Sequence, residues 1–466
     1  MSAYTPTIGL EIHAELSTKS KMFCGCKNAP HGGLPNEYTC PVCLAHPGTL
    51  PRVNKEAVKK VLLVGEALAG ELATYSEFDR KNYFYPDIPK AYQLSQYDHP
   101  FVKGGQLAGV SITRVHLEED TARSQHQGED SIVDFNRSGV PLMELVTEPV
   151  IHDANTAGDF ARELQLLLRT LGVSEANMEK GEMRVEANIS ISSTNELGTK
   201  VEVKNLNSFK SVEQAIEYEI SRQSEILNNN KVILQETRGW DEVKGKTFSQ
   251  RTKETAEDYR YFPDPDIPKY DIATARDDLS LDMPKLPSVL RQEWAAVGLS
   301  EAQVEILLQN TALKSFFAAS LPILASDKAK VKLAGNYLTS DLAGLLRDDG
   351  SKKLDTINTR QFAKLIEMLS ASEVTSRVAK DLLVEVVFEG KDPAELARER
   401  GLLQTNSASE LEALVQKIIE ANQSVAGDYK TGKEAALQYL VGQAMKETKG
   451  GANPSLLAEL FRKDLA

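Results

Sequence analysis

The sequence predicts an α+β protein, in which an N-terminal part built on an antiparallel sheet is followed by an all-α part. Apolar and polar residues alternate over 7–16, 110–120 and 183–206, as in strands with one buried face. From about Pro284 the apolar residues recur at helical spacing instead. The 466 residues correspond to roughly three domains of about 150 residues. We expect the divisions 1–290, 291–403 and 404–466.

Composition and charge exclude several classes of protein. The chain is 41% hydrophobic and 26% charged, which is enough for a sizeable core. Its net charge of −13 argues against nonspecific nucleic-acid coating and against an anionic membrane surface, although it leaves room for a local RNA site. No apolar run reaches the roughly 18–20 residues of a transmembrane helix, and the start lacks signal-peptide features. We therefore expect a cytosolic protein.

The first expected strand, Thr7–Leu16, places Glu11 and His13 on its polar face, because side chains in a strand alternate. Such a pair is commonly a structural hydrogen bond. A carboxylate and an imidazole on one strand can also form half of a divalent-cation site.

A β-hairpin is expected over Gly181–Phe209, with a Ser/Thr/Asn/Gly turn between two alternating runs. Its apolar side is formed mainly by valine and isoleucine. The opposite side carries two carboxylates and two cations, which are Glu186, Glu202, Arg184 and Lys204. On its own, this pattern also fits a solvated face with cross-strand ion pairs.

An acidic run closes the expected strand at Val110–Asp120. Adjacent acids repel one another and need either solvent or a cation. An exposed acidic turn satisfies this, but Glu118 and Glu119 can also join the carboxylates of the other strands. The sequence therefore favours a shared Mg²⁺ cluster, since Mg²⁺ prefers a few carboxylates together with phosphate oxygens.

All four cysteines fall within twenty residues, at Cys24, Cys26, Cys40 and Cys43. Two close pairs of thiolates suit tetrahedral zinc, and a closed four-sulfur site is structural because it leaves no position for substrate. Two nearby histidines, His31 and His46, are alternative ligands. Free buried thiols are the remaining alternative, and a disulfide framework is not expected in a cytosolic chain of this size.

Several further segments have readable patterns. The stretch Phe78–Asp98 is rich in aromatics and proline with interleaved cations, which fits either a packed lid or base stacking. Gly239–Thr247 fails the P-loop spacing, because five residues separate its glycines. The tail is expected to form two or three short helices. The lysines in the turns beside these helices either bind phosphates or are solvated. Longer helices are expected at Asn54–Glu71, Ala157–Leu171, Ser300–Gln309, Lys330–Leu346, Thr359–Ser370 and Ser376–Phe388.

Taken in order, these motifs resemble the GatB family, the B subunits of bacterial aspartyl/glutamyl-tRNA amidotransferases. The resemblance rests on GLEIHAEL, CGC…CPVC with PGTLPRVN, RKNYFYPDIPKAYQLSQYD, HLEED, NRSGVPLMELVTEP, MRVEANISI, VEVKNLNSF and EDYRYFPDPDIP. The segment GKEAALQYLVGQAMKETKGGANP is similar to that family's YqeY-like C-terminal domain. The match covers nearly the whole chain.

The resemblance implies a kinase-like cradle domain over 1–290, a helical domain and a YqeY-like tRNA-binding tail. It implies a heterotrimer with an amidase (the A subunit), which releases ammonia from glutamine, and with a small C subunit. The B subunit would bind Glu-tRNA(Gln) or Asp-tRNA(Asn), phosphorylate the side-chain carboxylate with ATP and complete the amide. This would be an ATP-dependent carbon–nitrogen ligase of protein biosynthesis.

The resemblance also assigns residues. The Mg²⁺ candidates are Glu11, His13, Glu119, Glu186 and Glu202, with Glu118 as an alternate ligand. The catalytic cations, as clamps for phosphate or substrate, would be Lys81, Arg184 and Lys204, of which Lys81 and Lys204 would also bind ATP. The structural Zn²⁺ would take the four cysteines.

Two other functions compete with this interpretation. One is a non-catalytic, zinc-containing scaffold that binds tRNA and holds partner enzymes together. The other is a metal-dependent hydrolase or nuclease that uses the same carboxylates and needs no ATP.

Overall fold

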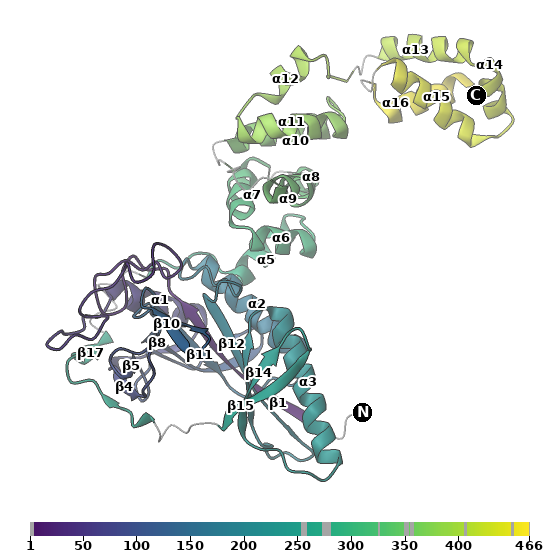
Figure 1. The fold of residues 1–466 in the computed structure, drawn as a ribbon. Helices are drawn as coiled ribbons and strands as arrows, with labels where there is room; N and C mark the ends of the chain where they lie inside the picture. Colours follow the sequence, from purple (N-terminus) through teal and green to yellow (C-terminus); the bar gives the residue numbers. More distant parts are fainter. Residues whose placement is uncertain are drawn as a thin grey trace. The chain divides into compact units, whose positions relative to one another are not determined.

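The chain divides into two compact units, Met1–Pro287 and Ser288–Ala466, and each is described by itself (Figure 1). The structure is a computed structural model that describes residues 4–252, 259–272, 281–324, 327–348, 354, 358–404, 408–448 and 452–465. The first unit is a mixed α/β domain on a largely antiparallel sheet, and the described part of the second unit is helical. The predicted fold class is confirmed, whereas the division at 290 and 403 stays a prediction.

A ten-stranded sheet forms the first unit, in the order β15-β14-β13-β12-β1-β11-β8-β6-β2, with β7 also paired to β8. All neighbours are antiparallel except β13 and β14, which are parallel. The strands are β1 Thr5–Glu15, β2 Glu71–Leu72, β6 Val102–Lys103, β7 Gln106–Leu107, β8 Val110–Glu119, β11 Pro141–Thr147, β12 Met183–Ser192, β13 Val201–Leu206, β14 Glu236–Asp241 and β15 Lys246–Thr252.

One face of this sheet is apolar and packs against three helices, α1 Lys55–Ala67, α2 Ala154–Thr170 and α3 Phe209–Asn228. The predicted alternation of the first strand and of the hairpin is confirmed. On β1 and β12 the apolar side chains are almost fully buried, namely Ile8, Leu10, Ile12, Ala14, Val185, Ala187, Ile189 and Ile191. The opposite face of the same strands is therefore left to the polar side chains.

Side-chain caps define where the helices begin. The Asn54 side chain accepts a hydrogen bond from Glu56 N at the start of α1, as expected of an N-cap. The Asp153 side chain does the same for Thr156 N, so α2 begins three residues before the predicted Ala157. The predicted start of α2 is corrected because the apolar pattern marks the buried side of the helix and not its first turn.

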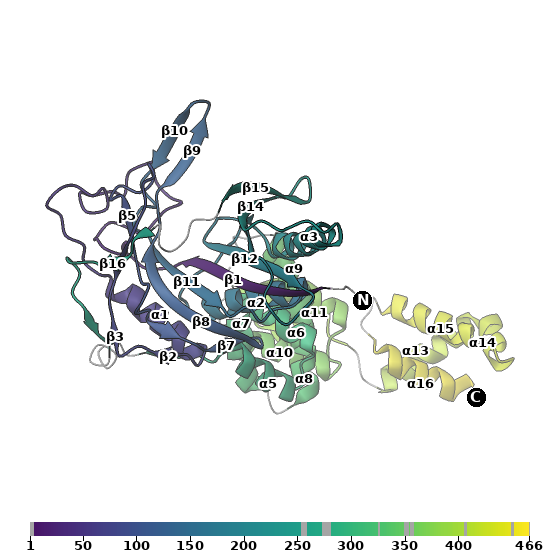
Figure 2. The ribbon, with the colours of Figure 1, turned by 90° about the horizontal axis from the view of Figure 1, so that it is seen from below.

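A small three-stranded sheet, β16-β4-β5, lies over the polar face near β8. Its strands are β4 Asp79–Asn82, β5 Tyr92–Ser95 and β16 Phe262–Pro263. The first two residues of the motif EDYRYFPDPDIP lie outside the described residues. Two more pairs complete the unit, the projecting hairpin of β9 Arg123–Gln127 and β10 Asp130–Asp134 (Figure 2), and β3 Tyr75–Ser76 with β17 Tyr270–Asp271.

In the second unit, helices α10 and α11 begin and end at the residues predicted from the sequence. The single helix predicted at Lys330–Leu346 is corrected, because a π-helical stretch interrupts it where the Thr339 and Ser340 hydroxyls donate to backbone carbonyls one turn earlier. The first group of elements is α5 Pro287–Ala296, α6 Glu301–Gln309, α7 Thr311–Leu324, α8 Lys328–Asn336, η2 Tyr337–Leu342, α9 Ala343–Asp348, α10 Thr359–Ser370, α11 Ser376–Phe388 and α12 Pro393–Glu399.

The described part of the tail forms four helices around a core of its own, whereas the sequence predicted two or three. They are α13 Ala408–Ala421, α14 Gln423–Lys430, α15 Glu434–Glu447 and α16 Pro454–Leu465. Among the residues that the structure describes, no helix is long and apolar enough to cross a membrane.

The central strand makes a prediction about stability. Ile12 is fully buried between β11 and β12, so Ile12→Ala is expected to lower the free energy of unfolding of the first unit by about 2–5 kcal/mol. Val243 is 97% exposed, and Val243→Ala should change the free energy of unfolding by less than about 0.5 kcal/mol. Hydrogen exchange in denaturant, followed on peptides from 1–287, measures both. Equal effects of the two variants would contradict this account of the core.

Candidate active site

The polar face of the large sheet gathers charged residues at its centre. In the strand register Glu11 lies opposite Glu186, and His13 lies opposite both Arg184 and Glu144. On the next strand Glu202 pairs with Asn188. Because these pairings place the side chains of one face within a few ångströms of each other, the sheet itself assembles the site.

Ligating atoms meet here in three overlapping groups, within each of which the atoms lie at most 4.8 Å apart. The first group consists of carboxylates only, and the other two combine carboxylates with histidine. They are Glu11, Glu186 and Glu202; Glu11, His13 and Glu144; and His116, Glu118 and Glu144. Of the six residues predicted for the metal, the structure brings five together, all except Glu119.

The two histidines share a buried pair of carboxylates. His13 Nε2 lies 3.4 Å from Glu144 Oε2 and 3.6 Å from Glu118 Oε1, and His116 Nε2 lies 3.3 Å from the same Glu144 oxygen. Burial alone disfavours a charged imidazole, but Glu144 and Glu118 outweigh it and raise the pKa of His13 to about 9 and that of His116 to about 8. Despite its own burial, Glu144 has a pKa well below its usual value because the two imidazoles stabilise its charge.

The carboxylate group has a lysine beside it. Lys204 Nζ lies 2.7 Å from Glu186 Oε2 and 4.0 Å from Glu202 Oε2. Glu202 also accepts a 2.6 Å hydrogen bond from the Thr237 hydroxyl on β14. Burial, followed by repulsion from Glu144 and Glu186, raises the pKa of Glu11 to about 7. The site thus contains more negative charge than its lysine neutralises, as a cation site requires.

The residues present fit a divalent cation such as Mg²⁺. The three clustered carboxylates are hard oxygen ligands. Next to Glu202 in the register, the buried Asn188 Oδ1 has no hydrogen-bond partner among the described residues. A buried amide oxygen without a partner is costly, and a cation or its bound water would satisfy it. Glu11, Glu186 and Glu202 are therefore the residues that would hold the ion.

The cavity above these carboxylates has a volume of about 340 Å³ and lies between the ten-stranded sheet and the three-stranded sheet β16-β4-β5. The large sheet supplies one wall, and the small sheet with its flanking loops supplies the other. Its lining residues include Glu11, Glu202, Lys204, Lys81, Tyr97, Tyr259 and Tyr261.

Two of the three predicted cations reach this cavity. Lys204 and Lys81 line it, and Lys81 Nζ lies 4.8 Å from the centroid of the Tyr259 ring. Burial opposes the charge of Lys81, but Tyr261, Glu118 and Glu144 outweigh it and raise its pKa above the usual value. Arg184 does not line the cavity, because its guanidinium donates a 2.9 Å hydrogen bond to Asp120.

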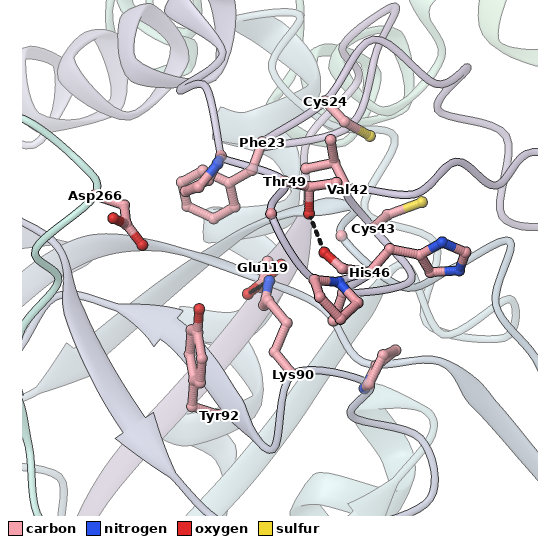
Figure 3. Close-up of a pocket in the computed structure, with 16 residues that line it drawn as sticks. Phe23, Cys24, Val42, Cys43, His46, Thr49, Lys90, Tyr92, Glu119 and Asp266 are labelled. Atoms are coloured by element: carbon pink, nitrogen blue, oxygen red, sulfur yellow. Dashed lines mark hydrogen bonds and ion pairs between the residues drawn. The ribbon is translucent and has the colours of Figure 1, made fainter.

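The prediction that Glu119 joins the metal cluster is corrected. Its carboxylate accepts hydrogen bonds from Lys90 Nζ and, at 3.0 Å, from Leu94 N. Figure 3 shows Glu119 and Lys90 in a second cavity of about 290 Å³, with Cys24 and Cys43 among its lining residues. The physical reason is that neighbouring residues of a strand point to opposite faces, so Glu118 and Glu119 cannot serve one site.

Sequence reasoning missed two residues of the site, His116 and Glu144. His116 precedes Glu118 by two residues on β8, so the alternation already placed both on one face. Glu144 is the only charged residue of β11. A single carboxylate inside an otherwise apolar strand needs a partner, and this was the signal available.

The four cysteines lie together, as the zinc prediction requires. All four sulfur atoms are within 4.8 Å of one another, and the Sγ atoms of Cys40 and Cys43 are 3.9 Å apart. Tetrahedral zinc with Zn–S bonds of about 2.3 Å places its sulfurs about 3.8 Å apart, so the residues fit this ion. Of the alternative ligands, His31 lies 3.5 Å from Glu15 instead, and neither His31 nor His46 belongs to the cysteine group.

Comparison with known proteins matches both parts of the chain. Residues 6–276 match the family model described as the GatB/GatE catalytic domain, and residues 322–465 match the one described as the GatB domain. Among curated proteins, the chain is 45% identical over 472 residues to the B subunit of the aspartyl/glutamyl-tRNA(Asn/Gln) amidotransferase of Thermus thermophilus, covering 99% of each.

Relatives of the same name occur in other bacteria. The protein of Caldanaerobacter subterraneus subsp. tengcongensis is 42% identical over 478 residues, with 99% of both chains covered. That of Carboxydothermus hydrogenoformans is 41% identical over 484 residues, with all of both chains covered. At this identity and coverage, the chain belongs to the GatB family.

Proposed function

We propose that this chain is the subunit of a glutamine-dependent tRNA amidotransferase that activates the misacylated tRNA and completes the amide. Its substrates are Glu-tRNA(Gln), Asp-tRNA(Asn) or both, and its products are Gln-tRNA(Gln) and Asn-tRNA(Asn). The observation that carries the proposal is a cluster of three carboxylates, two of which line one cavity together with Lys81 and Lys204. The chain matches amidotransferase B subunits over 99% of its length.

The chemistry requires an activated carboxyl group. A carboxylate is a poor electrophile, so its oxygen first attacks the γ-phosphorus of ATP, which forms an acyl phosphate and releases ADP. Ammonia then attacks the carbonyl carbon, the bond from that carbon to the phosphate oxygen breaks, and inorganic phosphate leaves with one of the original carboxylate oxygens. A proton lost from the ammonia nitrogen completes the amide.

The residues of the cavity divide this work. Glu11, Glu186 and Glu202 would hold Mg²⁺, which would offset the negative charge of the phosphates. Lys204 is positioned by Glu186. Its positive charge stabilises the γ-phosphoryl group as it passes from the ADP oxygen to the carboxylate oxygen of the substrate. Lys81 faces the same cavity from the small sheet and can neutralise the carboxylate or phosphate of the substrate.

The proposal extends to partners and location. Ammonia would come from an amidase, the A subunit, in a complex that also holds a small C subunit. The separately packed tail, whose Lys430 and Lys433 flank the turn between α14 and α15, would contact the tRNA backbone. The zinc centre would stiffen the loops between β1 and α1. An enzyme that modifies charged tRNA for translation would act in the cytoplasm.

Removing one metal-binding carboxylate tests the proposed catalysis. Glu202→Gln, in the complete complex, is expected to lower ATP-dependent transamidation at least about 100-fold, because a neutral amide holds Mg²⁺ poorly. The exposed Glu196→Gln, in the turn between β12 and β13, is the matched control and should keep full activity. The assay identifies the amino acid released from the tRNA. Full activity of Glu202→Gln with intact assembly would favour the scaffold function, and tRNA breakdown without ATP would favour the hydrolase.

The hydroxyl that holds Glu202 gives a second prediction. Thr237→Val removes the 2.6 Å hydrogen bond to Glu202 Oε2 with little change in volume. Loss of such a supporting bond commonly weakens metal affinity about 10- to 100-fold, so the Mg²⁺ concentration for half-maximal activity should rise by that factor. Thr237→Ser keeps the hydroxyl and should stay near the wild type. If both variants needed the same Mg²⁺ as the wild type, Glu202 would not be a ligand.

Metal analysis tests the zinc centre. The purified chain should hold about one zinc ion, Cys40→Ser should lose it, and the variant should unfold at a lower temperature. His46→Ala is the control, because His46 lies outside the cysteine group and should leave the zinc content unchanged. If Cys40→Ser retained zinc and His46→Ala lost it, the ligands would be histidine and cysteine together and not four cysteines.

A further inference from the structure

Part of the lining of the cavity above the carboxylates is aromatic. Tyr97 and Tyr261 stack there, with ring centroids 4.4 Å apart and planes inclined by 13°. Tyr259 meets Tyr261 edge-on at 6.1 Å. All three line the same cavity as Glu11 and Glu202. One cavity therefore contains a stack of flat rings and a cluster of ligands for a cation.

The outer ring of this stack is both fixed and exposed. The backbone nitrogen of Tyr97 donates a 2.8 Å hydrogen bond to Asp79 Oδ2, and Asp79 is a buried residue of β4 in the small sheet. Tyr261 supports the Tyr97 ring from the other side. Tyr97 nevertheless keeps 45% of its surface exposed. A ring held in place with free surface is suited to accept another planar ring.

Cations stand beside both parts of the lining. Lys81 lies 4.8 Å from the Tyr259 ring centroid and 5.9 Å from that of Tyr83, so it stands beside the aromatic part. Lys204 stands beside the carboxylates. A ligand that ran along the cavity would meet a flat aromatic surface, then positive charge, then a metal-binding cluster. A nucleotide has this order of groups, from base to phosphates and their metal ion.

We infer that Tyr97, supported by Tyr261, stacks on an adenine ring at the mouth of this cavity. The inference rests on the proposed function, which brings two adenosines here, that of ATP and the terminal adenosine of the acceptor end of tRNA. Both present the same planar base, and stacking on tyrosine does not distinguish between them. The source of the base is therefore decided by experiment.

Removal of the ring tests the inference in the complex assembled with its amidase and small subunits. Tyr97→Ala deletes the stacking surface, and Tyr97→Phe keeps it while removing the hydroxyl. Each is titrated with Mg²⁺–ATP, with Mg²⁺–tripolyphosphate, which lacks a base, and with uncharged tRNA(Gln) that either carries or lacks its terminal adenosine. Because Tyr97 is half exposed, both variants should keep the wild-type unfolding temperature.

If ATP supplies the base, Tyr97→Ala should weaken ATP binding roughly 5- to 100-fold, the range expected for the loss of one stack, and leave tripolyphosphate binding unchanged. If the tRNA supplies it, Tyr97→Ala should weaken the binding only of tRNA that carries its terminal adenosine. In both cases Tyr97→Phe should bind like the wild type. Unchanged affinity of Tyr97→Ala for every ligand would overturn the stacking site. Failure of the proposed function is a separate result, recognised by a wild-type complex that uses no ATP.

Discussion

The structure depends on holding like charges together at the centre of a sheet. Glu11, Glu186 and Glu202 bring their carboxylate oxygens within 4.8 Å. At such distances two negative charges repel by about 1–4 kcal/mol, depending on how well the surroundings screen them. Lys204 offsets part of this repulsion, but burial, followed by repulsion from Glu144 and Glu186, still raises the pKa of Glu11 to about 7. A divalent cation with bound phosphate is the kind of ligand that such a site favours.

The apolar face of the same strands fixes this geometry. A slip of one residue between β1 and its neighbours would turn Glu11 into the core and Ile12 out of it. The packing of α1, α2 and α3 against the apolar face makes that slip costly, so the core determines which carboxylates meet. The small sheet then closes the cavity from the other side and contributes Lys81, and the loop after β5 contributes Tyr97. In this way a structural constraint on strand register becomes a constraint on the chemistry.

Alternation along strands is enough to place Glu11 and Glu186 each on a polar strand face, and together with the helical spacing after Pro284 it predicts the fold class. It fails where both faces of a strand are covered. Nearly every residue of β11 is buried, so this strand does not alternate, and the one carboxylate in its apolar run is the only local sign of Glu144. Treating adjacent acids as one unit places Glu119 in the cluster, although Glu118 and Glu119 point to opposite faces. The neighbours of β11 and the partner of Glu119 depend on contacts between distant segments, which a local pattern does not contain.

Isotope transfer tests the central claim most directly, that the carboxylate itself is activated by phosphorylation. Glu-tRNA(Gln) labelled with ¹⁸O in both oxygens of the side-chain carboxylate is converted by the complete complex with ATP, Mg²⁺ and glutamine. The account predicts that each amide formed releases one inorganic phosphate carrying one ¹⁸O atom. Amide formation with unlabelled phosphate would contradict the account, because the phosphate would then never have been bonded to the carboxylate.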